Sequence, residues 1–595
     1  MPVLSLLYQT ILRAIALTGL LAGAVSSQQL TLSVTNEALQ ERLLMTSLVL
    51  QAEAETSAAD LVATARGDYE RLLAALYDEG YFGASISIRM NGREVSQISP
   101  FNPPANVRPI EVRVDPGPRF TFGRAEVTPL APGSAGTTGL APGQAASTSI
   151  IRNAASTAID DWRDASHAKA QITGQRITAR HAVSELDVEL FVAPGPALTF
   201  GRLVVPPDTS VRPERVLTIA GLPTGAAFSP DDVTKARSRL VATGTFSSVV
   251  AREAELPNAD GSLDIELELD PAPLRRLGFG AELSSTEGLT LETFWLHRNF
   301  FVGAERLRFD AGVSGIGGNS GGVDYSVRAL LSIPGFHRAD DQLDISAAFE
   351  RLDEAAFEQS LIEFGARRSR EVSEEFEIGL LAGFRFSEST DAFGTREFSH
   401  VTLLADAVLD RRDDSLNPTS GYFLSAAVEP FIGFSDSETG VVLRGDARAY
   451  RALGERTVVA GRFQIGSIQG ASVEGTPPDL LFFSGGGGTV RGQGFQSLGV
   501  PLPGDELTGG QSFAGLSLEL RQGITEALGV VGFVDYGFVA REGDFADGDS
   551  QAGAGIGLRY NTAFGPLRVD VGVPIGGSSD DDTTYGLYIG LGQAF

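Results

Sequence analysis

The sequence contains no cysteine and few histidines, and these absences exclude several classes of site. With 0 Cys in 595 residues, disulfides, thiolate zinc sites and thiol chemistry are excluded. With only 5 His, a metal centre built from several imidazoles is not expected. Basic residues are also outnumbered, since 47 Lys and Arg face 75 Asp and Glu. The resulting formal net charge of −28 argues against nucleic acid as a partner, because phosphate binding needs a basic surface.

Long apolar runs are missing as well, apart from a short one near the N-terminus. Arg13 precedes an apolar run over residues 14–25, which ends in small residues. This layout predicts a secretory signal peptide over residues 1–27, with an N-terminal anchor helix as the alternative. The run is shorter than the ~20 residues that a membrane-spanning helix needs. No later segment offers 18 consecutive apolar residues, so a membrane-embedded chain would have to cross with strands.

The first half of the chain repeats a short motif. "RVDPGPRFTFGR" at 113–124 returns as "FVAPGPALTFGR" at 191–202, and a degenerate copy, "LDPAPLRRLGFG", covers 269–280. The matching prolines, at 116, 194 and 271, are 78 and 77 residues apart. A fixed period of this length predicts tandem small modules. We place them at residues 28–117, 118–196 and 197–273.

Each module follows a similar order of a strand, helical material and two further strands. The helix-to-strand junction carries Gly80-Tyr81-Phe82 in the first module and Gly244-Thr245-Phe246 in the third, whereas the middle module lacks this mark. The order resembles that of POTRA domains, the polypeptide-transport-associated modules. Such modules could be spacers, or their edge strands could accept an extended peptide by strand addition.

From residue 274 the periodicity changes from helical to alternating. In "GPLRVDVGVPI", Leu567, Val569 and Val571 share one face, and Arg568 and Asp570 share the other. A soluble sandwich and a membrane barrel both alternate in this way, but some 320 residues of it, Gly-rich and behind a signal peptide, favour the barrel. At roughly 20 residues per strand and connection, the region 274–595 predicts an antiparallel transmembrane β-barrel of about 16 strands.

Five motifs occur in a fixed order in this second half. They are "HRNFFVGAERL" (297–307), "DRRDDSLNPTSGYF" (410–423), "LLFFSGGGGTVRGQGFQSLG" (480–499), "GVVGFVDYG" (529–537) and "AFGPLRVDVGVPI" (563–575). Together they resemble the Omp85 superfamily, also called bacterial surface antigen D15. Three modules and "IPGFHRADDQL" (333–343) make the chain most similar to the TamA group, the barrel subunits of the translocation and assembly module.

The resemblance assigns a role to the glycine-rich motif. It implies that the sixth extracellular loop folds back into the barrel, with Val490, Arg491, Gly492 and Phe495 at its tip. The family's arginine is held by an acidic residue of the inner wall. By strand parity three acidic residues face the lumen, Asp535, Asp570 and Glu519, and we favour Asp535 and then Asp570 as the partner; the alternative is a solvated arginine at a free loop tip. Two positions depart from the family pattern, Gln493 after Arg-Gly and Gln593 near the terminus. A nucleotide-binding loop is excluded, because no Lys-Ser/Thr follows the glycines.

The resemblance also implies a seam between the first barrel strand, about 276–284, and the last, about 584–595. Gly590 and Gly592 would weaken pairing there, because they have no side chain to pack, and Phe595 would end the strand.

The function that the resemblance implies is assembly, not catalysis. The chain is expected to insert unfolded outer-membrane client proteins through the seam, in contact with outer-membrane lipid, with its modules in the periplasm. A TamB-like periplasm-spanning partner would dock on the modules. No catalytic residue, metal or cofactor is expected. The alternative is a two-partner-type polypeptide secretion pore.

Overall fold

The computed structural model describes most of the chain, but not the residues at its two ends. The described residues are 28–33, 36–53, 55–99, 101, 103–105, 107–285, 288–318, 321–504, 506–562, 565–577 and 585–591. The predicted signal peptide, and Gly592, Gln593 and Phe595 of the predicted last strand, lie outside the described residues. Among the described residues, no helix is long and apolar enough to cross a membrane. The first two modules belong to one compact unit, and most of the third module belongs with the barrel to a second.

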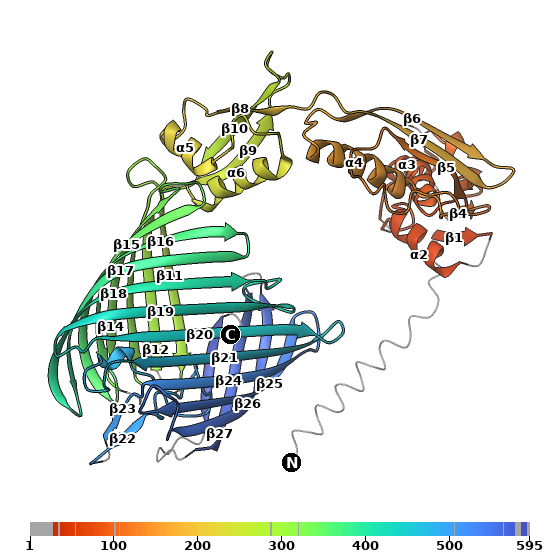
Figure 1. Ribbon diagram of the computed structural model, residues 1–595. Helices are drawn as coiled ribbons and strands as arrows, with labels where there is room; N and C mark the ends of the chain where they lie inside the picture. Colours follow the sequence, from red (N-terminus) through yellow and green to blue (C-terminus); the bar gives the residue numbers. More distant parts are fainter. Residues whose placement is uncertain are drawn as a thin grey trace, which may run out of the picture. The chain divides into compact units, whose positions relative to one another are not determined.

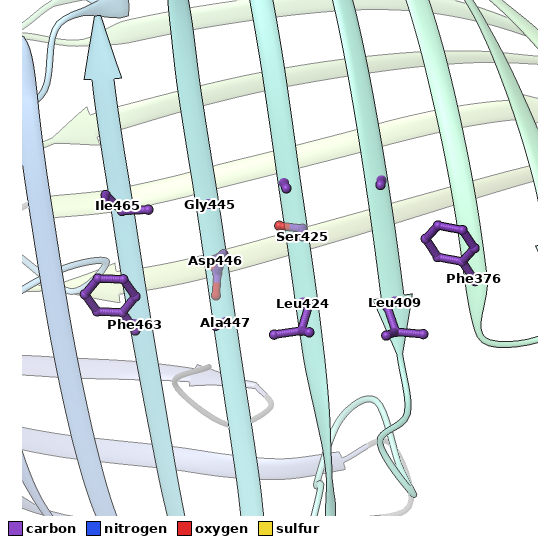
Figure 2. Close-up of a pocket in the computed structure, with 11 residues that line it drawn as sticks. Phe376, Leu409, Leu424, Ser425, Gly445, Asp446, Ala447, Phe463 and Ile465 are labelled. Atoms are coloured by element: carbon purple, nitrogen blue, oxygen red, sulfur yellow. The ribbon is translucent and has the colours of Figure 1, made fainter. Parts of the chain in front are cut away.

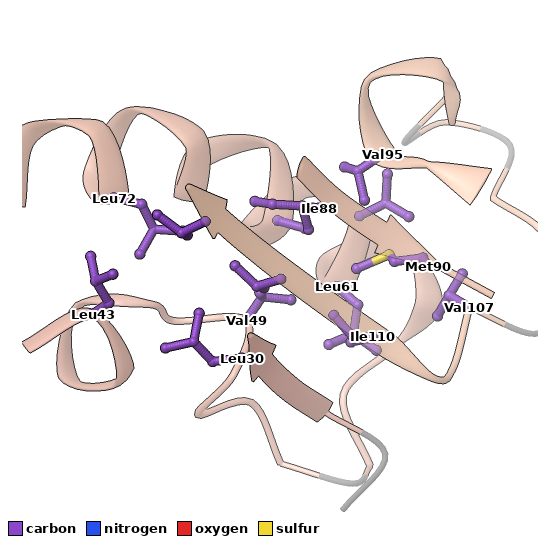
Figure 3. Packing of buried hydrophobic residues seen from close by; sticks show 14 of the residues in the cluster. Leu30, Leu43, Val49, Leu61, Leu72, Ile88, Met90, Val95, Val107 and Ile110 are labelled. Carbon is purple, nitrogen blue, oxygen red and sulfur yellow. The ribbon is translucent and has the colours of Figure 1, made fainter. Parts of the chain in front are cut away.

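The first module packs two helices on a four-stranded sheet. Its elements are β1 (Gln28–Leu32), α2 (Glu37–Thr46), α3 (Ala58–Asp78), β2 (Ser85–Met90), β3 (Arg93–Glu94), η1 (Val95–Gln97) and β4 (Ile110–Asp115). Helix α3 begins after Ser57, whose side chain accepts a hydrogen bond from the Asp60 N–H. Its apolar positions recur at helical spacing, so Leu61 and Leu72 point with Ile88 into one core (Figure 3).

The second and third modules repeat this order with small variations. The second contains β5 (Thr121–Thr128), α4 (Thr148–Asp164), β6 (Gln171–Arg180) and β7 (Glu185–Ala193). The third contains β8 (Thr199–Val204), α5 (Pro213–Ala220), α6 (Pro230–Ala242), β9 (Phe246–Glu253) and β10 (Ser262–Pro271). The second module has one helix where the others have two, because its segment 129–147 is rich in Gly and Pro, which disfavour helix.

The three modules share one sheet topology (Figure 1). The strand orders are β1-β4-β2-β3, β5-β7-β6 and β8-β10-β9, so the last strand of each module always lies in the middle of its sheet. The first strand runs parallel to the last in the first two modules. This common order is why the modules resemble POTRA domains, and it leaves the first strand of each module at a sheet edge.

The Gly-Tyr-Phe and Gly-Thr-Phe motifs lie between a helix and the strand that follows it. Gly80 has φ +90° and Gly244 has φ +65°, a left-handed region that glycine enters without strain. A Cβ on Gly80 would lie 2.7 Å from the carbonyl oxygen of Ala146. Glycine is therefore required at Gly80 both by its backbone angle and by the space available.

The second half of the chain is a closed antiparallel barrel, which confirms the predicted fold class and strand number. Sixteen strands close in sequence order, and the first, β11, pairs with the last, β28. They are β11 (Arg275–Ser284), β12 (Gly288–His297), β13 (Arg306–Ile316), β14 (Asp324–Pro334), β15 (Asp341–Asp353), β16 (Phe357–Ser373), β17 (Phe376–Asp391), β18 (Gly394–Asp410), β19 (Gly421–Ser435), β20 (Gly440–Ala452), β21 (Thr457–Gln469), β24 (Ser512–Gly523), β25 (Leu528–Ala540), β26 (Asp549–Thr562), β27 (Gly565–Gly576) and β28 (Gly586–Leu591).

The two faces of the barrel wall differ in polarity, as alternation requires. Figure 2 shows Leu424 and Phe463 on the outer wall beside Ala447, where a shallow apolar hollow of about 270 Å³ crosses β17 to β21. The neighbouring Asp446 has the opposite parity and binds two lumenal arginines, Arg448 and Arg462, at 2.9 and 2.7 Å. The outer face is thus suited to lipid and the inner face to charge.

Arg215 is one of several residues that join the third module to the barrel; the Arg212 N–H, for example, donates to the Val302 carbonyl oxygen at 2.9 Å. Arg215 on α5 donates hydrogen bonds to the carbonyl oxygens of Gly303 (3.4 Å), Gly335 (3.1 Å) and Pro334. Gly303 belongs to the β12–β13 connection, Pro334 ends β14 and Gly335 follows it, and Ala304 of the first connection is fully buried in the module's apolar core. The motifs at 297–307 and 333–343 are therefore docking sites for the third module.

Replacement of Arg215 by alanine should loosen this docking without unfolding the barrel. Three carbonyls lose a charged donor, while the barrel keeps its ladder hydrogen bonds. We expect limited proteolysis to cleave between β10 and β11 at least several-fold faster, while the barrel keeps its heat-modifiable migration in detergent gels. Arg237→Ala is the matched control, since Arg237 is an exposed arginine of the same module. Equal cleavage in both variants would mean that Arg215 does not hold the module.

Candidate functional site

A long segment between β21 and β24 enters the barrel and forms the site. We call residues 470–511 the lumenal loop; it contains η2 (Pro478–Leu480), β22 (Val500–Leu502) and β23 (Glu506–Thr508). The loop starts at the end of the barrel opposite the third module. β11 starts beside the module and the strands alternate in direction, so β21, the eleventh strand, ends at the opposite end. The tip of the loop is buried against the inner wall, with Val490 0% and Arg491 2% exposed.

Arg491 lies between three carboxylates of the inner wall. Its Nε and Nη2 donate to the two oxygens of Asp535, at 2.7 and 3.0 Å, and its backbone N–H donates to the same carboxylate at 3.1 Å. Its Nη1 lies 2.8 Å from Glu519 and 3.4 Å from Asp570. The structure therefore brings together all three candidate partners instead of selecting one. Only Asp535 forms the fork-to-fork pair that fits a guanidinium.

The three carboxylates differ in whether an arginine other than Arg491 pairs with them. Arg521 lies 2.8 Å from Glu519, and Arg559 pairs with Asp570. Among the described residues, the ion pair of Asp535 is with Arg491 alone. The cluster holds three acids and three arginines, so it carries no net charge, which a buried site requires. Removal of Arg491 would leave Asp535 without a cation, whereas Glu519 and Asp570 would each keep one.

An aromatic ring covers the remaining face of Arg491. The Cζ atom lies 3.6 Å from the centre of the Phe533 ring, which comes from β25 two residues before Asp535. A guanidinium over a ring face gains cation–π energy of about 2 kcal/mol when both are desolvated. Phe533 is 3% exposed, so its contact with Arg491 is fully desolvated. The ring and the carboxylate of one strand thus hold the arginine from two sides.

The loop tip fits into a cradle of glycines on adjacent strands. A Cβ on Gly553 of β26 would lie 2.0 Å from the carbonyl oxygen of Arg491, and one on Gly572 of β27 would lie 2.8 Å from the Gly492 nitrogen. Gly492 itself has φ +95°, and a Cβ there would lie 2.6 Å from the Val573 nitrogen. Loop and wall approach backbone to backbone, which only glycine allows. This explains the glycines of both partners.

Two further contacts at the tip were not predicted from the sequence. Gln493 donates through Nε2 to the carbonyl oxygens of Ala552 (2.9 Å) and Gly576 (3.0 Å). The Gly492 N–H donates to the hydroxyl of Tyr588, at 3.1 Å, and Tyr588 belongs to the last strand. The departure of Gln493 from the family pattern was the available signal for the first contact. Nothing local to Tyr588 pointed to the second.

Phe495 does not join the arginine cluster. It is half-buried and lines a separate lumenal space of about 650 Å³ with three other aromatic residues of the loop and wall, Phe482, Phe483 and Phe513. Phe495 thus packs beside the loop body, while Val490 and Gly492 pack at the tip.

The loop has a second charged anchor, on a different part of the wall. Asp479 in η2 forms an ion pair with Arg385 of β17 and accepts a hydrogen bond from Gln359 of β16 at 2.8 Å. Arg385 also lies 3.2 Å from Glu363. The loop thus presents an acid to β16 and β17 and a base to β24, β25 and β27. Sequence reasoning missed Asp479, because an acidic residue in an irregular loop carries no periodic signal.

The seam between the first and last barrel strands has little backbone pairing. Within the described residues, β11 pairs with β28 at two positions, Leu283 with Ile589 and Ser284 with Tyr588. By contrast, β11 pairs with β12 at ten positions. Gly590 lies next to the end of the seam pairing, and Gly592 and Phe595 lie outside the described residues.

In the comparison with known proteins, most of the barrel matches one family model. The model of the Omp85 superfamily domain matches residues 315–595. Among solved structures, BamA from Haemophilus ducreyi lacking POTRA domains 1–3 is 16% identical, with a TM-score of 0.64 over 79% of this chain and 100% of that one. CdiB from Acinetobacter baumannii is 13% identical, with a TM-score of 0.50 over 79% of this chain and 90% of that one. At these identities the likeness shows the fold alone.

Among the described residues, Asp535 has its ion pair with Arg491 alone, and this predicts which carboxylate couples most strongly to Arg491. In double-mutant cycles with Arg491→Ala, we expect a coupling energy of about 2–3 kcal/mol for Asp535→Ala and a smaller one for Glu519→Ala and Asp570→Ala, because the latter two keep an arginine. The free energy of unfolding in lipid vesicles measures it. Equal coupling for the three acids would contradict the fork-to-fork assignment.

The glycine cradle predicts that a single methyl group displaces the loop tip. Gly553→Ala should force the Arg491 carbonyl away and make the lumenal loop at least tenfold more sensitive to external protease. Gly532→Ala is the matched control, because a Cβ there meets nothing within 4 Å. Both variants should keep the barrel's heat-modifiable migration. A protected loop in Gly553→Ala would show that the tip is not seated as described.

Proposed function

Since residues 315–595 of this chain are an Omp85 superfamily domain, we propose that the protein inserts β-barrel or autotransporter-type clients through the seam between β11 and β28. It is a bacterial outer-membrane barrel with its modules in the periplasm. The observation that carries the proposal is the seam, where, within the described residues, two residue pairs join strands whose other neighbours pair at six or more positions.

The seam meets the physical need of an unfolded client. In lipid, each unpaired N–H or C=O of a strand costs several kcal/mol. A strand edge exposed by parting of the seam offers those groups their partners one strand at a time. Over the described residues, β11 pairs with β28 at two positions and with β12 at ten, so parting at the seam would be less costly than at the junction of β11 with β12. The client would add to an edge that the barrel itself leaves weakly paired.

The modules would bring clients to the seam. Each module has a sheet with a strand at either edge, and an edge strand can receive an extended segment by strand addition. The first module would bind a TamB-like partner in the periplasm. The third module is held to the barrel by Arg215, so a client bound there would lie beside the barrel mouth.

No catalysis is invoked in this mechanism. The ion pairs of the lumenal cluster hold a loop in place, and insertion changes backbone pairing without making or breaking a covalent bond. We therefore propose that the protein is not an enzyme and uses no cofactor.

A cross-seam disulfide tests the proposal. The chain has no cysteine, so Leu283→Cys/Ile589→Cys introduces the only pair, at facing seam positions. We expect oxidised protein in vesicles to lose at least 90% of its acceleration of client-barrel insertion, and reductant to restore it. Thr293→Cys/Ala311→Cys, which joins β12 and β13, is the matched control and should have no effect.

The same experiment separates the proposal from its alternative. If the seam disulfide leaves client insertion unchanged, lateral insertion is wrong. If the locked barrel still passes a soluble polypeptide into the vesicle, the protein is a polypeptide secretion pore of the two-partner type.

A further inference from the structure

An ion pair crosses the seam on the lumenal side. Arg568 of β27 donates from Nη2 to a carboxylate oxygen of Glu282 on β11, at 3.4 Å. The two residues come from strands that are not neighbours, because β28 lies between them. The contact therefore passes over the last strand and connects the strands on either side of it.

The residue beneath this contact is Gly590. It pairs with Arg568 across the β27–β28 ladder, and the seam register that pairs Leu283 with Ile589 brings Glu282 opposite Gly590. Arg568, Gly590 and Glu282 thus form one row across three strands. A Cβ on Gly590 would lie 3.0 Å from the Arg568 Nε and 3.4 Å from the Glu282 carboxylate. The absence of a side chain at Gly590 leaves the path along which the guanidinium reaches β11.

The row stands where the described backbone pairing of the seam stops. Ser284 and Leu283 are paired with β28, and the Ser285 N–H donates to the Leu587 carbonyl oxygen at 3.1 Å, but the ladder does not extend to Glu282. A cavity of about 220 Å³ opens at this row, lined by Glu282, Arg568, Gly590 and residues of β11 and β12. The ion pair spans the seam one row beyond the last backbone pair found among the described residues.

We propose that Glu282 and Arg568 form a side-chain clasp that holds the seam shut over Gly590 and sets how often β11 and β28 separate. Gly590, the first described residue of β28 beyond its pairs with β11, is the residue that admits the clasp. Closure of the seam then depends in part on a charge pair that can break and re-form.

The strength of the ion pair between Glu282 and Arg568 suits a seam that opens and closes. The side chain of Glu282 is 56% exposed and that of Arg568 15%, so water screens the pair and its contribution is that of a surface ion pair. Such a pair changes an opening equilibrium by about two- to fivefold. This is enough to bias the seam toward closure, and too little to close it permanently.

The test measures seam closure without any client. In the Leu283→Cys/Ile589→Cys background, the rate of disulfide formation under mild oxidant in vesicles reports how often the two strands lie together. We expect Glu282→Gln and Arg568→Gln each to lower this rate about two- to fivefold, and the charge exchange Glu282→Arg/Arg568→Glu to restore most of it. High salt should slow the reaction in the unmodified background and leave the two Gln variants unchanged.

Glu292→Gln is the matched control. Glu292 lines the same cavity but has no ion pair with Arg568 within the described residues, so its removal should leave the rate unchanged. A rate in Glu282→Gln equal to that of the unmodified background, or a charge exchange that fails to rescue, would overturn the clasp. Because Glu282 is largely exposed, its substitution should leave the barrel folded.

The clasp rests on the proposed function for its biological meaning, and the two can fail separately. If the Gln variants close more slowly but the seam disulfide does not block client insertion, the clasp stands and lateral insertion falls. If the disulfide blocks insertion but the Gln variants close at the normal rate, insertion stands and the clasp falls.

Discussion

Backbone hydrogen bonding in a solvent that offers no partners is the constraint on which this protein depends. Within lipid every N–H and C=O of the wall must be paired, so the sheet has to close and its sixteen strands must run in register. The seam departs from that rule within the described residues, with two pairs at its junction. A weakly closed seam costs stability in the resting barrel, so we connect it with the transfer of strands into the membrane.

Closure of the wall leaves the interior free to be polar, and the chain fills it with matched charges. Three acids and three arginines surround the loop tip, and a second set, with Asp479 and Arg385, holds the loop body. Charges buried in this way are costly to separate but specify geometry closely, because a guanidinium fork accepts only one orientation of a carboxylate. The lumenal loop is thereby fixed to two parts of the wall that are far apart in the sequence.

The sequence predicted the architecture of the barrel better than it predicted the side-chain contacts inside it. Alternation and length were sufficient for the barrel, because lipid and lumen impose opposite polarity on successive residues. Parity was sufficient to place Glu519, Asp535 and Asp570 on the inner wall, but it could not rank them, since their ranking depends on Arg521 and Arg559, which pair with two of them across strands. Gln493, Tyr588 and Asp479 were beyond sequence reasoning, because their partners are backbone atoms or residues tens of positions away.

The docking of the third module makes the two sides of the seam mechanically unequal. β11 is backed by ten pairs with β12, and the connection after β12 carries Gly303, to whose carbonyl Arg215 of the module donates. β28 is backed by six pairs with β27 within the described residues and has no module behind it. Any separation of the two strands should therefore displace β28 while β11 keeps its place. A client strand that enters would have β11, which stays in place, on one side and β28, which moves, on the other. Insertion would therefore have a direction around the barrel.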